Sequence, residues 1–78
     1  MKKEIDLYTS GIMKSKRLEK KWSQQQLADQ MGVSRGFIND IESKKKINHL
    51  NVSHLNLLGE IFQCSPRDFL PEHPILEV

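Results

Sequence analysis

Two helix starts and one helix stop fall within the stretch WSQQQLADQMGVSRGFINDIE, residues 22–42 of this 78-residue chain. Ser23 and Gln26 make the S-x-x-Q pattern of a capping box, in which each side chain satisfies a backbone N–H group of the other residue. Gly32 stands where helices commonly end in the left-handed conformation. Ser34 is a preferred N-cap for the helix that follows. These local signals predict two short helices joined by a sharp turn.

The two predicted helices cover residues 24–31 and 35–42, and the turn covers residues 32–34. Apolar residues recur in both helices at the spacing of one helical face. They are Leu27, Ala28, Met31, Ile38 and Ile41. Val33 lies in the turn, where an apolar side chain is useful only if the turn folds onto the core. A glycine-containing turn of this length joins helices at a steep angle, which is the helix-turn-helix geometry.

Three further helices are expected around this pair. An amphipathic pattern predicts a first helix over residues 7–20, and Asn51 is placed to cap a fourth. The segment SPRDFL, residues 65–70, combines a serine cap with proline at the first helical position and predicts a fifth. No stretch alternates apolar and polar residues as a half-buried strand would. The predicted fold is all-α, a compact bundle of five short helices.

The length of the chain leaves room for one core. We expect residues 1–6 to form a flexible N-terminal arm in which Lys2 and Lys3 are exposed. Residues 7–70 are expected to form the helix-turn-helix domain. Residues 71–78 are expected to form an irregular tail available for dimerisation.

Composition indicates a folded protein of the cytoplasm. The chain is 37% hydrophobic and 28% charged, which is typical of folded domains. It has no apolar run near the roughly 18 residues of a membrane span, and MKKEID lacks the apolar segment of a secretory signal. The single cysteine, Cys64, excludes an internal disulfide and fits a reduced compartment as a small core residue.

Basic residues are concentrated in one part of the chain. Residues 14–46 contain nine Lys or Arg and four Asp or Glu, a balance of +5. The other residues contain three basic and six acidic groups, a balance of −3. This asymmetry favours one face that binds an anionic partner.

Signals for catalysis or metal binding are missing from the sequence. No serine lies in a nucleophile turn, and neither a glycine-rich phosphate loop nor a paired carboxylate arrangement is visible. His49 and His54 are five residues apart across a helix cap, which is not a usual spacing for metal ligands. We therefore expect no enzyme activity, no metal, no cofactor and no small-molecule ligand.

Four segments together resemble the Xre family, the helix-turn-helix domains of the lambdoid phage repressor and Cro type. They are KSKR (14–17), WSQQQLADQMGVS (22–34), the I-x-x-IE of residues 38–42, and LNLLGEIFQCSPRDFL (55–70). The resemblance covers about four-fifths of the chain, residues 10–70, and implies a lambda-repressor-like fold of bacterial or phage origin. It also implies binding to double-stranded DNA through the helix at residues 35–42.

The polar face of that helix supplies the predicted base-reading residues Arg35, Gly36, Asn39 and Asp40. Arg35 is suited to guanine O6 and N7, and Asp40 to the N4 amino group of cytosine. Asn39 is suited to adenine or to a phosphate. An equally good interpretation of Asp40 is a solvated helix charge. Gly36 stands where related proteins often place a base-reading side chain. Either it allows close approach of the backbone to DNA, or glycine is simply tolerated at this position.

The predicted phosphate-contacting residues are Lys14, Arg17, Gln24, Ser34, Ser43, Lys44, Lys45 and Lys46. Gln24 opens a helix whose N-terminal N–H groups attract anions. The resemblance also implies an ion pair between Arg17 and Glu42, which leaves Arg17 with two roles. The family commonly has glycine where this chain has Lys44. The loop is therefore expected either to turn differently or to hold Lys44 in a strained left-handed conformation.

The predicted function is sequence-specific binding of double-stranded DNA by a transcriptional regulator, a repressor that acts as a homodimer on a palindromic operator. Apolar residues near the C-terminus supply the expected dimer surface: Phe69, Leu70, Ile75, Leu76 and Val78. The alternative is a protein-interaction module or antitoxin-type partner protein that uses the same scaffold and binds through this tail.

Overall fold

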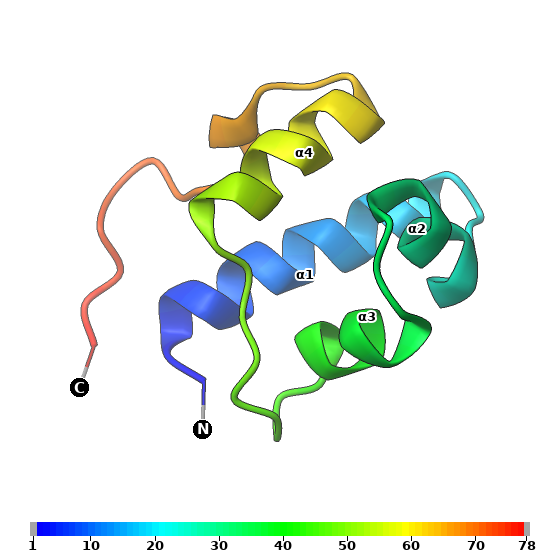
Figure 1. The fold of residues 1–78 in the computed structure, drawn as a ribbon. Coiled ribbons are helices and arrows are strands. Elements are labelled where there is room, and N and C mark those ends of the chain that lie inside the picture. Colours follow the sequence, from blue (N-terminus) through cyan, green and yellow to red (C-terminus); the bar gives the residue numbers. More distant parts are fainter. Residues whose placement is uncertain (1, 78) are drawn as a thin grey trace.

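A computed structural model describes residues 2–77, and Figure 1 shows the arrangement of its helices. The elements in chain order are α1 (Glu4–Glu19), α2 (Gln24–Met31), α3 (Arg35–Glu42), α4 (Val52–Phe62) and a 3-10 helix, η1 (Pro66–Phe69). Helix α1 runs through the middle, α2 and α3 lie at one end of it, and α4 covers its other side (Figure 1). Residues 2–77 contain no strand. The predicted all-α fold is confirmed.

The fifth predicted helix is a single 3-10 turn, so the structure has four α-helices between residues 2 and 77. The Ser65 cap and the proline at the first helical position are present as the sequence indicates. The turn stops at Phe69 because Leu70 is extended, with φ −116° and ψ 148°, and Pro71 cannot continue a helix.

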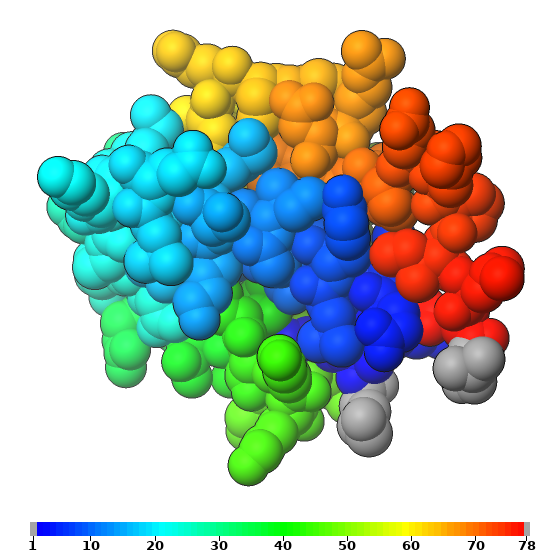
Figure 2. Space-filling view, turned by 180° about the vertical axis from the view of Figure 1, so that it is seen from behind, coloured from blue at the N-terminus to red at the C-terminus, as the bar shows by residue number. Residues whose placement is uncertain are grey.

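Helix α1 begins at Glu4, three residues before the predicted start, so residues 4–6 belong to the domain and not to an arm. The reason is a long-range cap. The Glu77 carboxylate accepts hydrogen bonds from the backbone N–H groups of Glu4 at 3.1 Å and Ile5 at 3.3 Å. These groups have no partner inside a helix, and an acid next to them is stabilising. Figure 2 shows the tail lying beside the first turns of α1.

The prediction of an exposed arm is also wrong for Lys2, which is only 8% exposed. Its ammonium group lies against the end of α3, as described below. Lys3 is exposed, as expected, and Met1 lies outside the described residues.

Helices α2 and α3 have the predicted bounds because their capping signals act locally. Ser23 Oγ accepts from the N–H of Gln26 at 3.1 Å, and the Gln26 side chain accepts from the N–H of Ser23 at 2.7 Å. Gly32 ends α2 with φ +71°, in the left-handed region. Ser34 Oγ accepts from the N–H of Phe37 at 3.0 Å and starts α3.

Helix α4 packs tightly against η1 at Gly59. A Cβ atom at this position would come within 2.9 Å of the Cys64 carbonyl oxygen and 3.1 Å of Pro66. Any larger residue would therefore force α4 and η1 apart. The N-terminus of α4 is closed by a reciprocal pair, in which Asn51 and His54 each accept from the backbone N–H of the other.

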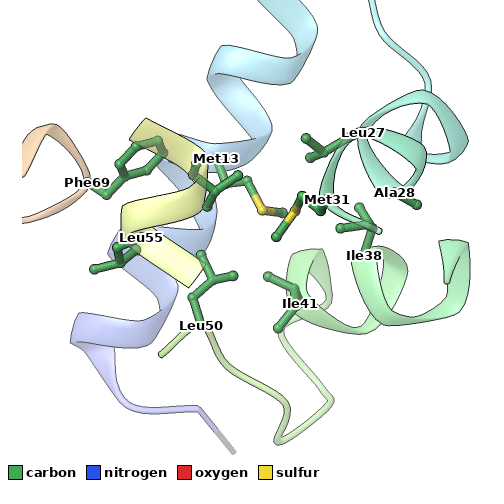
Figure 3. Close-up of a cluster of buried hydrophobic side chains, with 10 residues drawn as sticks. Met13, Leu27, Ala28, Met31, Ile38, Ile41, Leu50, Leu55 and Phe69 are labelled. Atoms are coloured by element: carbon green, nitrogen blue, oxygen red, sulfur yellow. The ribbon is translucent and has the colours of Figure 1, made fainter. Parts of the chain in front are cut away.

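The core lies where α1, α2, α3, α4 and η1 meet (Figure 3). Its completely buried large side chains are Met13, Leu27, Ile38, Ile41, Leu58 and Phe69. Because Phe69 is one of them, its predicted place on a dimer surface is wrong. Trp22 packs against Phe62 with ring centroids 5.6 Å apart, so it ties the α1–α2 connection to α4.

Candidate nucleic-acid interface

Helix α3 divides cleanly into a buried and an exposed face. Ile38 and Ile41 are completely buried and fix the helix on the core. Arg35, Gly36 and Asn39 are exposed. Asp40, also a predicted base reader, is half-buried near the end of the helix. The structure thus brings the four predicted residues together on one helix.

A hydrogen-bonded network joins the start of α2 to both ends of α3. Arg17 holds the Glu42 carboxylate through two bonds, Nε to Oε2 at 2.8 Å and Nη2 to Oε1 at 2.9 Å. Glu42 Oε1 also accepts from the Gln24 side-chain amide at 3.0 Å. Gln24 Oε1 in turn accepts from Arg35 Nη1 at 3.4 Å. The network therefore connects the buried ion pair to the first exposed side chain of α3.

Arg17 is occupied by this structural role. Its side chain is 8% exposed and that of Glu42 is 4% exposed. The remaining guanidinium nitrogen, Nη1, donates to the Trp22 carbonyl at 2.7 Å. All three nitrogens thus have partners inside the domain, so the buried Arg17 side chain is poorly placed for the predicted phosphate contact.

The other predicted phosphate-contacting residues lie around α3. Ser34 and the lysines at 14, 44, 45 and 46 are exposed, while Gln24 and Ser43 are half-buried. Lys14 on α1 and Lys44 in the loop line the same small hollow, of about 140 Å³. The hollow is also lined by Glu42, so Lys14 and Lys44, from two distant segments, both lie near the end of α3.

The loop after α3 turns without a left-handed residue at Lys44. Within residues 2–77 the residues with positive φ are Lys21, Gly32 and Gln63. The chain leaves α3 through Ser43, which is extended with φ −86° and ψ 133°. The Ser43 hydroxyl accepts from the N–H of Lys45 at 3.2 Å and shapes the turn that follows. Of the two expectations for this loop, a different turn is the one observed.

Sequence reasoning missed the part played by Lys2. Its ammonium donates to the carbonyl oxygens of Asp40 at 2.7 Å, Ile41 at 2.6 Å, and Ser43. Burial lowers the pKa of Lys2, and the carboxylates of Asp40 and Asp6 offset part of this effect. No local pattern signals the contact, because the partners are 38 or more positions apart.

Phe37 lies at the edge of the core rather than on the outer face of α3. It is half-buried, and its ring packs against the His54 ring with centroids 5.3 Å apart. This contact with His54 places Phe37 at the edge of the core. The fully exposed face of α3 therefore consists of polar residues and Gly36, and the Phe37 ring is not part of it.

No helix within residues 2–77 is long and apolar enough to cross a membrane.

No curated protein showed significant similarity to the sequence. The sequence does match the helix-turn-helix family over residues 13–69, which is 57 of the 78 residues. This match includes α2, the Gly32 turn and α3, and it confirms the resemblance inferred from the sequence motifs. Two short capped helices joined at Gly32 agree with this match, and the chain belongs to the Cro/C1-type helix-turn-helix family of DNA-binding regulatory domains.

Proposed function

We propose that this protein is a transcriptional repressor that binds a palindromic operator in double-stranded DNA as a homodimer. The observation that carries the proposal is the exposed polar face of α3, held rigidly from beneath by Ile38 and Ile41. A helix of this kind fits the major groove, where each base pair presents a distinct pattern of donors and acceptors.

Arg35 and Asn39 are the principal base readers in this proposal. They are four residues apart, so they lie on the same face of α3, about one turn from each other. Arg35 would donate to guanine O6 and N7, and Asn39 would pair with adenine N6 and N7. The bond from Arg35 to Gln24 supports this assignment, because it orients the guanidinium before DNA arrives.

Gly36 and Asp40 have secondary roles. A Cβ atom at Gly36 would meet only Ser34 Oγ, at 3.8 Å, so packing within the domain does not require glycine there. The role proposed for Gly36 is to leave space for DNA, because it has no side chain. Asp40 is suited to accept from cytosine N4, and the nearby Lys2 ammonium reduces its repulsion of phosphate.

Phosphate contacts would come from both sides of α3. The N-terminus of α2, at Gln24, offers backbone N–H groups and the positive end of the helix dipole. Lys14 and the loop residues 44–46 supply exposed positive charge near α3. Non-specific affinity for DNA arises mainly from such contacts, and they make binding sensitive to salt.

Dimerisation is proposed through the C-terminal segment. Leu70 is 45% exposed and Leu76 is 84% exposed, and burying large apolar side chains of this kind favours association. A two-fold dimer would read two half-sites about one helical turn, roughly 34 Å, apart. Bound over a promoter, it would exclude the polymerase.

Selection of bound sites from a pool of random duplexes tests this proposal. The expected product is a pair of inverted half-sites with a fixed spacing. Enrichment of a single half-site would refute the dimer, and failure to enrich any sequence would refute sequence-specific binding. Sedimentation of the Leu76→Asp variant with the selected duplex tests the proposed dimer surface. The mass of the complex should show that this variant binds as a monomer.

A further inference from the structure

Helix α3 ends differently from α2 and α4. Those two helices end in left-handed residues, Gly32 and Gln63, and the next residues donate back to helix carbonyls at 3.0 Å and 2.9 Å. Such bonds satisfy carbonyl groups that a helix leaves without partners. After α3, Ser43 is extended, and its N–H reaches only the Asp40 carbonyl, at 3.2 Å. The end of α3 therefore lacks the return hydrogen bonds that close α2 and α4, and its carbonyls are open to a donor from elsewhere.

Lys2 is that donor. An ammonium group carries three N–H bonds, and the three acceptors here are the carbonyls of Asp40, Ile41 and Ser43. The positive charge also lies at the negative end of the helix dipole, where it is favourable. With its side chain this well buried and all three donors occupied, Lys2 is held in one place.

The position of Lys2 is set by α1. The helix begins two residues later, at Glu4, and Glu77 caps its first N–H groups. Lys3, the residue between, is the N-cap of α1 and is exposed. Lys2 therefore connects the fixed start of α1 to the end of α3, across 38 to 41 positions of sequence.

We propose that Lys2 is a positioning residue for DNA binding, because it caps the carboxyl end of the recognition helix and fixes the direction in which the lysine loop leaves. The three carbonyls it holds span the junction between α3 and residues 44–46. Lys2 thereby orders the loop lysines and Asp40 without touching DNA itself. This inference rests on the proposed function of α3.

The first test measures backbone amide hydrogen exchange by NMR in the free protein. Lys2→Met keeps the apolar stem and removes the ammonium, and Lys3→Met is a matched control with the same change in charge. Exchange at Glu42 and Ser43 should become faster in Lys2→Met, with α2 and α4 unchanged, and Lys3→Met should resemble wild type. Equal acceleration in all helices would show a role in global stability only and would overturn the proposal.

The second test measures affinity for the selected duplex at a temperature where all variants are folded. Lys2→Met should bind roughly five- to tenfold more weakly, because the helix end must be ordered before contact. Its salt dependence should match wild type, since the loop lysines still reach phosphate once ordered. A salt slope smaller by about one, with unchanged exchange, would mean a direct phosphate contact and overturn the proposal.

The outcomes separate this inference from the proposed function. If wild type binds no duplex, the proposed function fails and the positioning role falls with it. If wild type binds and Lys2→Met and Lys3→Met bind equally well or equally weakly, only the role of Lys2 is refuted.

Discussion

Replacing Arg17 by methionine should be among the most destabilising single changes in this domain. The side chains of Arg17 and Glu42 are 8% and 4% exposed and share two charge-assisted hydrogen bonds, at 2.8 and 2.9 Å. After the change, the Glu42 carboxylate stays buried, and of its present partners only the Gln24 amide remains. Leaving one partner of a buried pair uncompensated typically costs about 3–5 kcal/mol.

That cost is large for a chain of 78 residues. At about 0.05–0.15 kcal/mol per residue, the whole free energy of unfolding is on the order of 4–12 kcal/mol. Urea unfolding, followed by helical circular dichroism and by Trp22 fluorescence, should therefore show a much lower midpoint for Arg17→Met. Lys14→Met on the exposed side of α1 has the same change in charge and should stay within about 0.5 kcal/mol of wild type.

A second variant separates the buried charge from lost packing. Arg17→Met with Glu42→Leu removes both charges, so the double variant should recover much of the stability lost by Arg17→Met. Three results would refute the reasoning. The first is a loss under about 1 kcal/mol in the single variant, which is the size expected for an exposed pair. The second is a loss that disappears in 1 M salt. The third is no recovery of stability in the double variant.

Three further predictions test the interface and the turn. Arg35→Ala should cost about 1–3 kcal/mol of binding free energy at one base pair of the selected site, and an equal loss on every sequence would remove its base-reading role. Lys45→Ala should weaken binding to all duplexes and reduce the slope of log affinity against log salt by about one; an unchanged slope would exclude a phosphate contact. Gly32→Ala meets no steric obstacle but must adopt φ +71°, so thermal unfolding should show a loss of about 1–2 kcal/mol, and an unchanged midpoint would contradict the conformational role of this glycine.

Sequence reasoning succeeded where structure is determined by neighbouring residues. The bounds of α2 and α3 follow from Ser23, Gly32 and Ser34, whose capping bonds or left-handed backbone act within a few residues. The buried stripe of α3 follows from its helical spacing in the same way. For this reason the exposed positions of Arg35 and Asn39 could be anticipated without coordinates.

It failed where a contact joins segments that are far apart in the sequence. The start of α1 depends on Glu77, more than 70 positions away, and the end of α3 depends on Lys2. A pattern of caps and periodicity carries no information about such pairs. The ion pair between Arg17 and Glu42 is also long-range. It was anticipated from the family resemblance and not from any pattern within the segment around Arg17.

The short length of η1 has a different cause. Ser65 and Pro66 start the turn as expected, but only four residues fit before Leu70 becomes extended. Burial of Phe69 in the core fixes this point, and the sequence pattern does not distinguish a buried aromatic from one that a partner would cover.

The most direct test of base reading by α3 is an NMR titration of the labelled protein with the selected duplex. The largest amide shifts are predicted for Arg35 to Asp40, with smaller ones at the start of α2 and in residues 44–46. Amide shifts in α4 and the tail should be small, apart from those that dimerisation itself causes. Shifts centred on residues 70–77, with α3 unchanged, would contradict the account.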